Sequence, residues 1–148
     1  MKPKCSRSQP QLLTGPVLYG PDDALAALRL TVGDPQGELI AALVCDAEHR
    51  LLTAPVFEAT CLDAAPKVLS RLLQAVEGMI LPGVVLAIYR PGSSTYLTPA
   101  ELHVLDGLFE MCDDTDADLL DVFIVNGHRW RSIAELTDLR PGDEHDDQ

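Results

Sequence analysis

Two runs of apolar residues restrict the fold of this chain more than any other feature of its sequence. Leu39 to Cys45 and Val84 to Tyr89 contain no charged side chain, and polar residues, glycine or proline flank each run. A membrane helix needs about 20 apolar residues, so both runs are too short to cross a bilayer. Short continuous apolar runs are typical of strands buried on both faces of a sheet. The sequence therefore predicts an α/β protein without a membrane span.

Helical patterns occupy the segments around these strands. From Pro66 to Leu81 apolar side chains recur at helical spacing. Residues 98–101, Thr-Pro-Ala-Glu, form a strong helix start, since Thr can cap, Pro suits the first position and Glu can bind the cap amide. A shorter helix is expected from Pro21 to near Gly33. With strands at 39–45, 51–57, 84–89, 119–125 and 129–131, the order α, β, β, α, β, α, β, β predicts a single-domain layered sandwich: a mixed β-sheet flanked by helices.

The ends of the chain differ in composition from its centre. The chain has 148 residues, enough for one domain of ordinary size. Residues 1–16 are rich in Ser, Gln and Pro, and residues 140–148 are rich in acids. We expect both segments to be disordered tails and residues 17–139 to form the domain.

The charge and the cysteines exclude several classes of protein. The formal net charge is −12, from 23 acidic and 11 basic residues, and the basic residues are scattered, which disfavours nucleic-acid binding. Residues 5–11 are polar where a signal peptide needs its apolar region, so a cytoplasmic protein is expected. No two cysteines are close in sequence, so we predict reduced structural thiols and no zinc knuckle.

The block from Val84 to Val125 carries a more specific pattern. It contains Ile88-Tyr89-Arg90-Pro91, then Gly92-Ser93-Ser94, then Thr98-Pro99-Ala100-Glu101, and finally Leu120-Asp121-Val122. This block resembles the RadC group of the JAB/MPN (JAMM) family, in which a strand runs into H-x-H-P, S-x-x-D opens a helix and the next strand begins Leu-Asp-His. Glu38 stands at the family's catalytic glutamate position. The resemblance implies the cytidine deaminase-like architecture of that family.

The same resemblance places the changed residues at a zinc site. The family supplies two His and one Asp to the metal, and its glutamate takes the proton of the bound water. Here the His positions are Ile88, which cannot bind metal, and Arg90, a permanent cation. Carboxylates persist at Glu38 and Glu101. The resemblance therefore implies a degenerate member, with remnant site positions Glu38, Ile88, Arg90, Thr98 and Glu101, no metal site and no cofactor.

We hypothesise that the guanidinium of Arg90 pairs with Glu101 or Glu38 and neutralises the former metal pocket. Thr98 and Glu101 also have an ordinary role as a capping box, and Glu38 as a solvated acid. Asp121 and Trp130 are interpreted as structural residues. Residues that would contact a ligand in the old cleft are Tyr89, Arg90, Ser93 and Ser94.

Three functions are compatible with this pattern. The first is a catalytically inactive RadC/JAB-like domain that acts by binding, through a protein partner or self-association. The second is a metal-dependent hydrolase of peptidase or isopeptidase type, with zinc held by Glu38, Glu101 and a His from elsewhere. His49, His103 and His128 are the candidates, although His103 and Glu101 do not share a helix face. The third is a small-ligand-binding module, since a fold alone does not set function.

Overall fold

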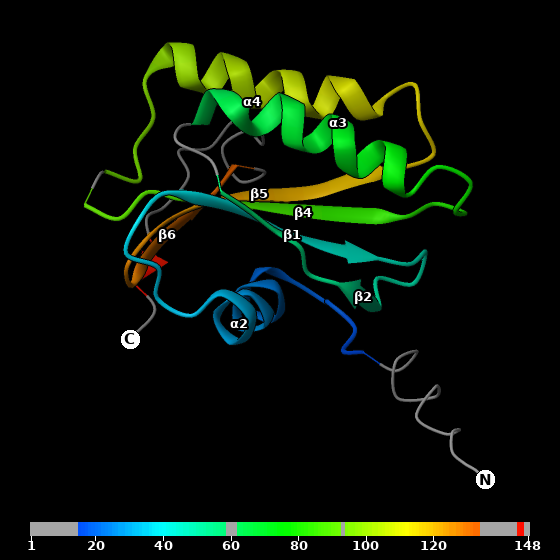
Figure 1. Cartoon of the computed structure of the whole chain (residues 1–148), viewed down its shortest axis with the longest axis horizontal. Helices are drawn as coiled ribbons and strands as arrows, with labels where there is room; N and C mark the ends of the chain where they lie inside the picture. Colours follow the sequence, from blue (N-terminus) through cyan, green and yellow to red (C-terminus); the bar gives the residue numbers. More distant parts are fainter. Residues whose placement is uncertain (1–14, 59–61, 93, 134–144, 147–148) are drawn as a thin grey trace, which may run out of the picture.

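The computed structural model describes residues 15–58, 62–92, 94–133 and 145–146. It is a layered α/β sandwich in which a seven-stranded sheet has the strand order β2-β1-β4-β5-β6-β7, with β3 paired to β1 (Figure 1). Helix α2 (Pro21–Val32) covers one face, and helices α3 (Ala65–Ala75) and α4 (Pro99–Cys112) cover the other. The remaining elements are β1 Leu39–Cys45, β2 Leu51–Thr53, β3 Val56–Glu58, the 3-10 helix η1 Leu62–Ala64, β4 Gly83–Tyr89, β5 Asp118–Asn126, β6 Arg129–Ser132 and β7 His145–Asp146.

The mixed sheet expected from the sequence is confirmed. Strands β4 and β5 are parallel and are joined through α4, whereas the other strand pairs of the sheet are antiparallel. Strands β1 and β4 pair along their whole length, from Leu39 opposite Tyr89 to Cys45 opposite Gly83. The two apolar runs therefore lie side by side at the centre of the sheet.

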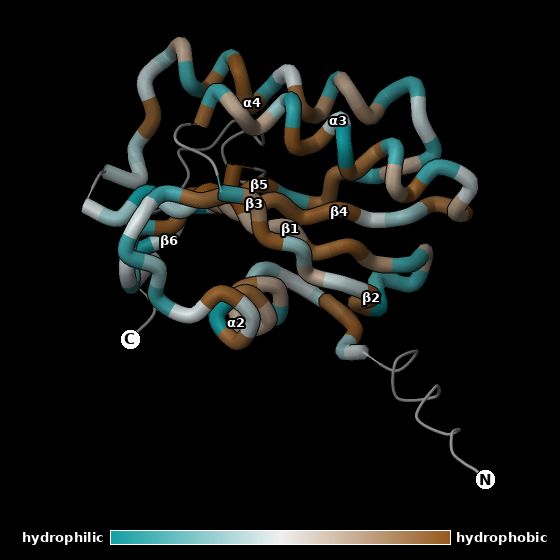
Figure 2. The backbone as a smooth tube through the Cα atoms, viewed as in Figure 1, coloured by the Kyte–Doolittle hydropathy of each residue, from teal (hydrophilic) through white to brown (hydrophobic). Residues whose placement is uncertain are grey.

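Alternate residues of the central strands enter two separate cores. Ile40, Leu86 and Ile88 face α3 and α4, where they pack with Leu105 and Leu108 of α4. Their neighbours Leu43, Ala87 and Tyr89 face α2 and pack with Leu25 and Leu28. In Figure 2 the residues of these strands are coloured as mainly hydrophobic, and the strands lie between the helical layers. The alternation means that Ile88 and Tyr89 belong to opposite sides of the sheet.

Two predicted elements have different bounds. The strand predicted at 51–57 is divided into β2 and β3 at Ala54 and Pro55, because proline has no N–H for the ladder. The helix predicted to reach Leu81 ends at Ala75, and Gly78 has a φ of 92° in the turn that follows. Ile80, predicted to lie on the buried stripe of that helix, is 80% exposed.

The C-terminal segment is in part a strand. Residues 134–144 and 147–148 lie outside the described residues, but His145 and Asp146 pair with β6. The edge strand β6 offers unpaired N–H and C=O groups, and the short strand β7 pairs with it. The expected N-terminal tail lies outside the described residues up to residue 14, and Val17 forms a bridge with Arg50. Within the described part of the chain, no helix is long and apolar enough to cross a membrane.

Candidate functional site

Arg90 follows the last residue of β4 and turns toward α4. Its N–H donates to the carbonyl oxygen of Val125 at 2.8 Å, which continues the pairing of β4 with β5 by one residue. Because Ile88 faces α4, strand alternation directs Arg90 to the same face. Ile88 is 2% exposed and packs in the core. Ile88 and Arg90 thus lie on one face of the sheet.

The guanidinium of Arg90 forms an ion pair with Glu101. Nη2 of Arg90 lies 3.2 Å from Oε2 of Glu101, and the two side chains are 19% and 24% exposed. The other carboxylate oxygen, Oε1, accepts the N–H of Thr98 at 2.9 Å, while Thr98 Oγ1 accepts the N–H of Glu101 at 3.1 Å. The capping box and the pairing of Arg90 with Glu101 are both confirmed. One carboxylate therefore caps α4 and pairs with Arg90.

The loop after Arg90 is tied to the adjacent hairpin and to itself. The N–H of Gly92 donates to Oδ1 of Asn126 at 3.1 Å, and Gly92 has a φ of 82°, which a residue with a Cβ rarely adopts. Ser94 is exposed, and its Oγ accepts the N–H of Tyr96 at 2.9 Å. Nη1 of Arg90 is buried and has no hydrogen-bond partner among the described residues. This group is therefore a buried donor without a hydrogen-bond acceptor among the described residues.

A second arginine on this face was missed by the sequence analysis. Arg131 of β6 is opposite Ile124 in the ladder and is only 2% exposed. Its guanidinium carbon lies 3.6 Å from the ring centroid of Tyr96, a cation–π contact that holds the loop against the sheet. Thr95, beside Tyr96, is 1% exposed. In the sequence, Arg131 belongs to a short predicted strand at the edge of the sheet, where a charged residue is expected to be exposed. Its burial could therefore not be predicted.

One of the predicted ligand contacts, Tyr89, does not share a site with Arg90. Tyr89 faces α2, and its buried hydroxyl has no hydrogen-bond partner among the described residues. Burial raises the pKa of Tyr89 to about 12, with a smaller opposing effect of Arg29. Ser93 lies outside the described residues. Arg90 therefore pairs with α4 on one side of the sheet, whereas Tyr89 belongs to the opposite layer.

Glu38 lies near Arg90 but is not paired with it. Leu39 is opposite Tyr89, so Glu38 is placed in register with Arg90 at the end of the strands. Glu38 is exposed, and the described residues give it no ion pair. In the described ranges, no group of three His, Cys, Asp or Glu residues is arranged to hold a metal ion. The carboxylates of Glu38 and Glu101 are thus not gathered with a histidine in this structure.

The residues interpreted as structural do pack in the interior. Asp121 is 9% exposed, its Oδ2 accepts the hydroxyl of Ser132 at 2.6 Å and its Oδ1 accepts the N–H of Val122 at 2.7 Å. Trp130 is buried and contacts Phe123 edge-to-face, with ring centroids 5.6 Å apart. Cys45 and Cys112 are buried free thiols, as predicted; Cys5 and Cys61 lie outside the described residues.

The structure defines a class of protein: an α/β sandwich in which the residue after the central strand β4 is an arginine paired with the capping glutamate of the next helix. No protein-family model matches the chain. The chain is 30% identical over 125 residues to a UPF0758 protein of Cupriavidus taiwanensis. That match covers 82% of this chain and 54% of the relative, so the chain spans about half the length of the curated protein it matches.

Proposed function

We propose that this chain is a degenerate RadC-like domain of the JAB/MPN family that has no catalytic zinc and acts by binding. The similarity to a UPF0758 protein supports the family assignment, since UPF0758 designates the RadC-like proteins. The order of elements agrees with it as well, because β4, the loop, α4 and β5 follow in the sequence order of the family pattern. A JAB-type architecture is the fold that this assignment implies.

The observation that carries the proposal is the ion pair between Arg90 and Glu101. A zinc ion at this position would need neutral imidazoles at residues 88 and 90 and a free carboxylate at residue 101. Instead Ile88 packs in the core, Arg90 supplies a positive charge, and both oxygens of Glu101 are engaged by Thr98 and Arg90. The guanidinium thus balances a carboxylate that zinc balances in the family.

The binding surface that we propose is the exposed loop at the C-terminal end of β4. It has a buried donor on Arg90, the exposed hydroxyl of Ser94 and the ring of Tyr96, which is 62% exposed. Exposed aromatic rings beside hydrogen-bonding groups are frequent contact points in protein interfaces. A protein partner or a second copy of this chain is the occupant that we expect.

Metal analysis of the purified chain tests the loss of the zinc site. After dialysis against buffer without chelator, we expect far less than one zinc per chain, and added zinc should leave the thermal unfolding temperature unchanged. Stoichiometric zinc retained through dialysis would overturn the proposal in favour of a hydrolase. A thermal-shift screen of metabolites addresses the small-ligand alternative, and light scattering after gel filtration measures self-association.

A further inference from the structure

A groove lies at the end of the molecule opposite the ion pair of Arg90 with Glu101. Its cavity volume is about 430 Å³, and it runs between the end of α3, the start of β4 and the turn that joins α4 to β5. Pro82, which lines the groove, directly precedes β4, whereas Arg90 directly follows that strand. The full length of β4 therefore separates the two sites, roughly 23 Å at about 3.3 Å per residue. The groove is independent of the degenerate zinc site.

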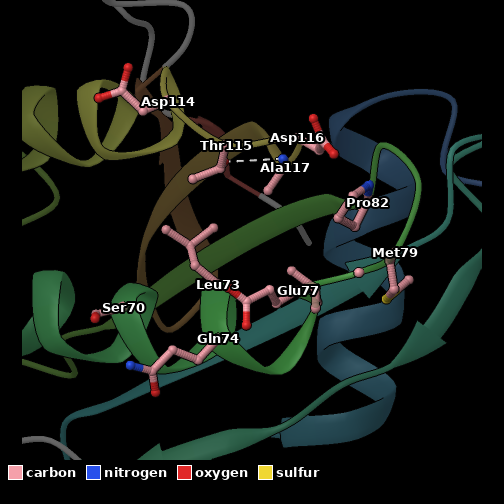
Figure 3. Close-up of a pocket in the computed structure, with 12 residues that line it drawn as sticks. Ser70, Leu73, Gln74, Glu77, Met79, Pro82, Asp114, Thr115, Asp116 and Ala117 are labelled. Atoms are coloured by element: carbon pink, nitrogen blue, oxygen red, sulfur yellow. Dashed lines mark hydrogen bonds between the residues drawn. The ribbon is translucent and has the colours of Figure 1, made fainter.

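The groove has an apolar floor and an acidic rim. Leu73 and Met79 are partly buried against the core. The rim carries the exposed carboxylates of Glu77, Asp114 and Asp116, and no lysine or arginine lines the groove in the described structure. In Figure 3 the side chains of Leu73 and Glu77 face the turn with Thr115, whose hydroxyl accepts the N–H of Ala117. The surface is therefore apolar at its base and negative at its edge.

Two exposed apolar side chains are next in sequence to residues of this groove. Ile80 and Leu81 are 80% and 60% exposed, and they stand in sequence between Met79 and Pro82, which both line the groove. The carbonyl oxygen of Pro82 accepts the N–H of Asp118 at 2.8 Å, so this segment is fixed to the turn that carries the acids. Adjacent exposed apolar side chains beside a groove are typical of a site that a partner covers.

We propose that this groove binds a peptide segment of a protein partner that carries an apolar side chain flanked by lysine or arginine. The apolar side chain would fill the floor beside Leu73 and Met79 and cover Ile80, while the flanking cations would offset the three rim carboxylates. A second copy of this chain offers few cations to this acidic rim, because its 11 basic residues are scattered among 23 acidic ones. Nucleic acid has the same sign as the rim.

A peptide-binding assay with the full chain tests this proposal. The probes are short fluorescent peptides with a central Leu, Ile or Phe between Lys or Arg residues, compared with sets that have Ser or Glu flanks or a central Ser. We expect the basic apolar set to bind, with affinity falling as salt rises, and the other sets to bind about tenfold more weakly or not at all. Equal binding of the sets with basic and acidic flanks would overturn the proposal.

Matched variants locate the binding surface. Charge reversal at the rim, Glu77→Lys, Asp114→Lys and Asp116→Lys together, should weaken binding by about tenfold or more. The control is the same reversal at the exposed acids Asp22, Glu48 and Asp106, which keeps the net charge equal to that of the rim variant. Equal losses in the two variants would mean that only overall charge attracts the peptide, which overturns the proposal.

A second variant tests the apolar part without altering the charge. Ile80→Ser removes an exposed side chain that the fold does not need, so it should keep the thermal unfolding temperature and weaken peptide binding severalfold. Unchanged affinity in this variant together with unchanged affinity in the rim variant would contradict the proposal. So would stoichiometric binding of calcium in place of the peptide. None of these outcomes depends on zinc at residues 88–101, so they are separate from the test of the proposed function.

Discussion

The carboxylate of Glu101 takes part in both a helix cap and an ion pair. Its Oε1 accepts the N–H of Thr98 and its Oε2 pairs with Arg90, so each oxygen has its own partner. Glutamine keeps one carbonyl oxygen for the cap but removes the negative charge. Substitution at this residue can therefore separate the capping contribution from the ion pair.

We expect a favourable coupling between Arg90 and Glu101. In a double-mutant cycle with Arg90→Met and Glu101→Gln, the coupling free energy should be about 1 kcal/mol, because the pair is more buried than a surface pair yet still reached by water. Urea unfolding of the four proteins measures it. Arg71→Met, at an exposed arginine of α3, is the control and should cost less than Arg90→Met. A coupling near zero would mean that Arg90 contributes only through packing.

The buried thiol of Cys45 should make stability fall at alkaline pH. Burial, and to a lesser extent Asp46, raises the pKa of Cys45 to about 11 from an ordinary 9.0. Between these two values the unfolded chain has released the proton while the folded chain keeps it, so the free energy of unfolding falls as pH rises. Below pH 9 this contribution is fully present, and above pH 11 it is lost.

Comparison with Cys45→Ala isolates that effect. Between pH 9 and 11 the wild-type chain should lose roughly 2 to 3 kcal/mol more than the variant. Chemical denaturation at several pH values measures the difference, and the other raised groups, Tyr89 and Cys112, are present in both proteins and cancel. Parallel pH profiles would show that the thiol ionises without a cost to folding.

Some contacts of the site could be predicted from single residues and others could not. The ion pair of Arg90 with Glu101 was predicted from the resemblance to the RadC group, because that resemblance aligns Arg90 with a metal ligand that lies near acids. The contact of Arg131 with Tyr96 joins a strand to a distant loop. No spacing rule relates two such residues, since the contact depends on how the loop folds back. Tyr89 was predicted to share a ligand site with Arg90, but strand alternation places it on the opposite face of the sheet.

At the scale of elements, the end of α3 shows the limit of periodic patterns. Apolar spacing predicted a helix as far as Leu81, and it did identify the buried face through Leu72. The helix nevertheless ends at Ala75, because the chain must turn to enter β4, and Gly78 supplies the positive φ for that turn. Ile80 and Leu81 keep the apolar character of the pattern without its burial.

Leu81 should be an unfavourable residue for its backbone conformation. Its φ is 47°, in the left-handed region that costs a residue with a Cβ about 1–2 kcal/mol. Leu81→Asn should raise the free energy of unfolding by up to about 1 kcal/mol, because asparagine tolerates this region. Ile80→Asn makes a similar exposed change without positive φ, so it should have an effect close to zero. Equal effects in urea unfolding would remove the argument from strain.

At the scale of the whole molecule, two ends of one sheet carry different surfaces. One end has the ion pair of Arg90 with Glu101, and the other end has the acidic groove. The strands β1 and β4 were predictable because both are continuously apolar. The groove could not be predicted, because Asp114 and Asp116 form an acidic turn in the sequence and nothing there relates them to the end of α3. At the end of the sheet near Arg90, Ile88 adds to the core.

If the family register is right, reversing the substitutions should restore a metal site. The variant with Ile88→His, Arg90→His and Glu101→Asp places two imidazoles on one face of β4 and a carboxylate at the start of α4. We expect about one zinc per chain after dialysis, measured by atomic emission, and a zinc-dependent rise in the unfolding temperature. Ile88→His and Tyr89→His together are the control, because strand alternation puts these residues on opposite faces and should leave zinc unbound. A folded triple variant without zinc would show that residues 88, 90 and 101 do not correspond to the family's ligands.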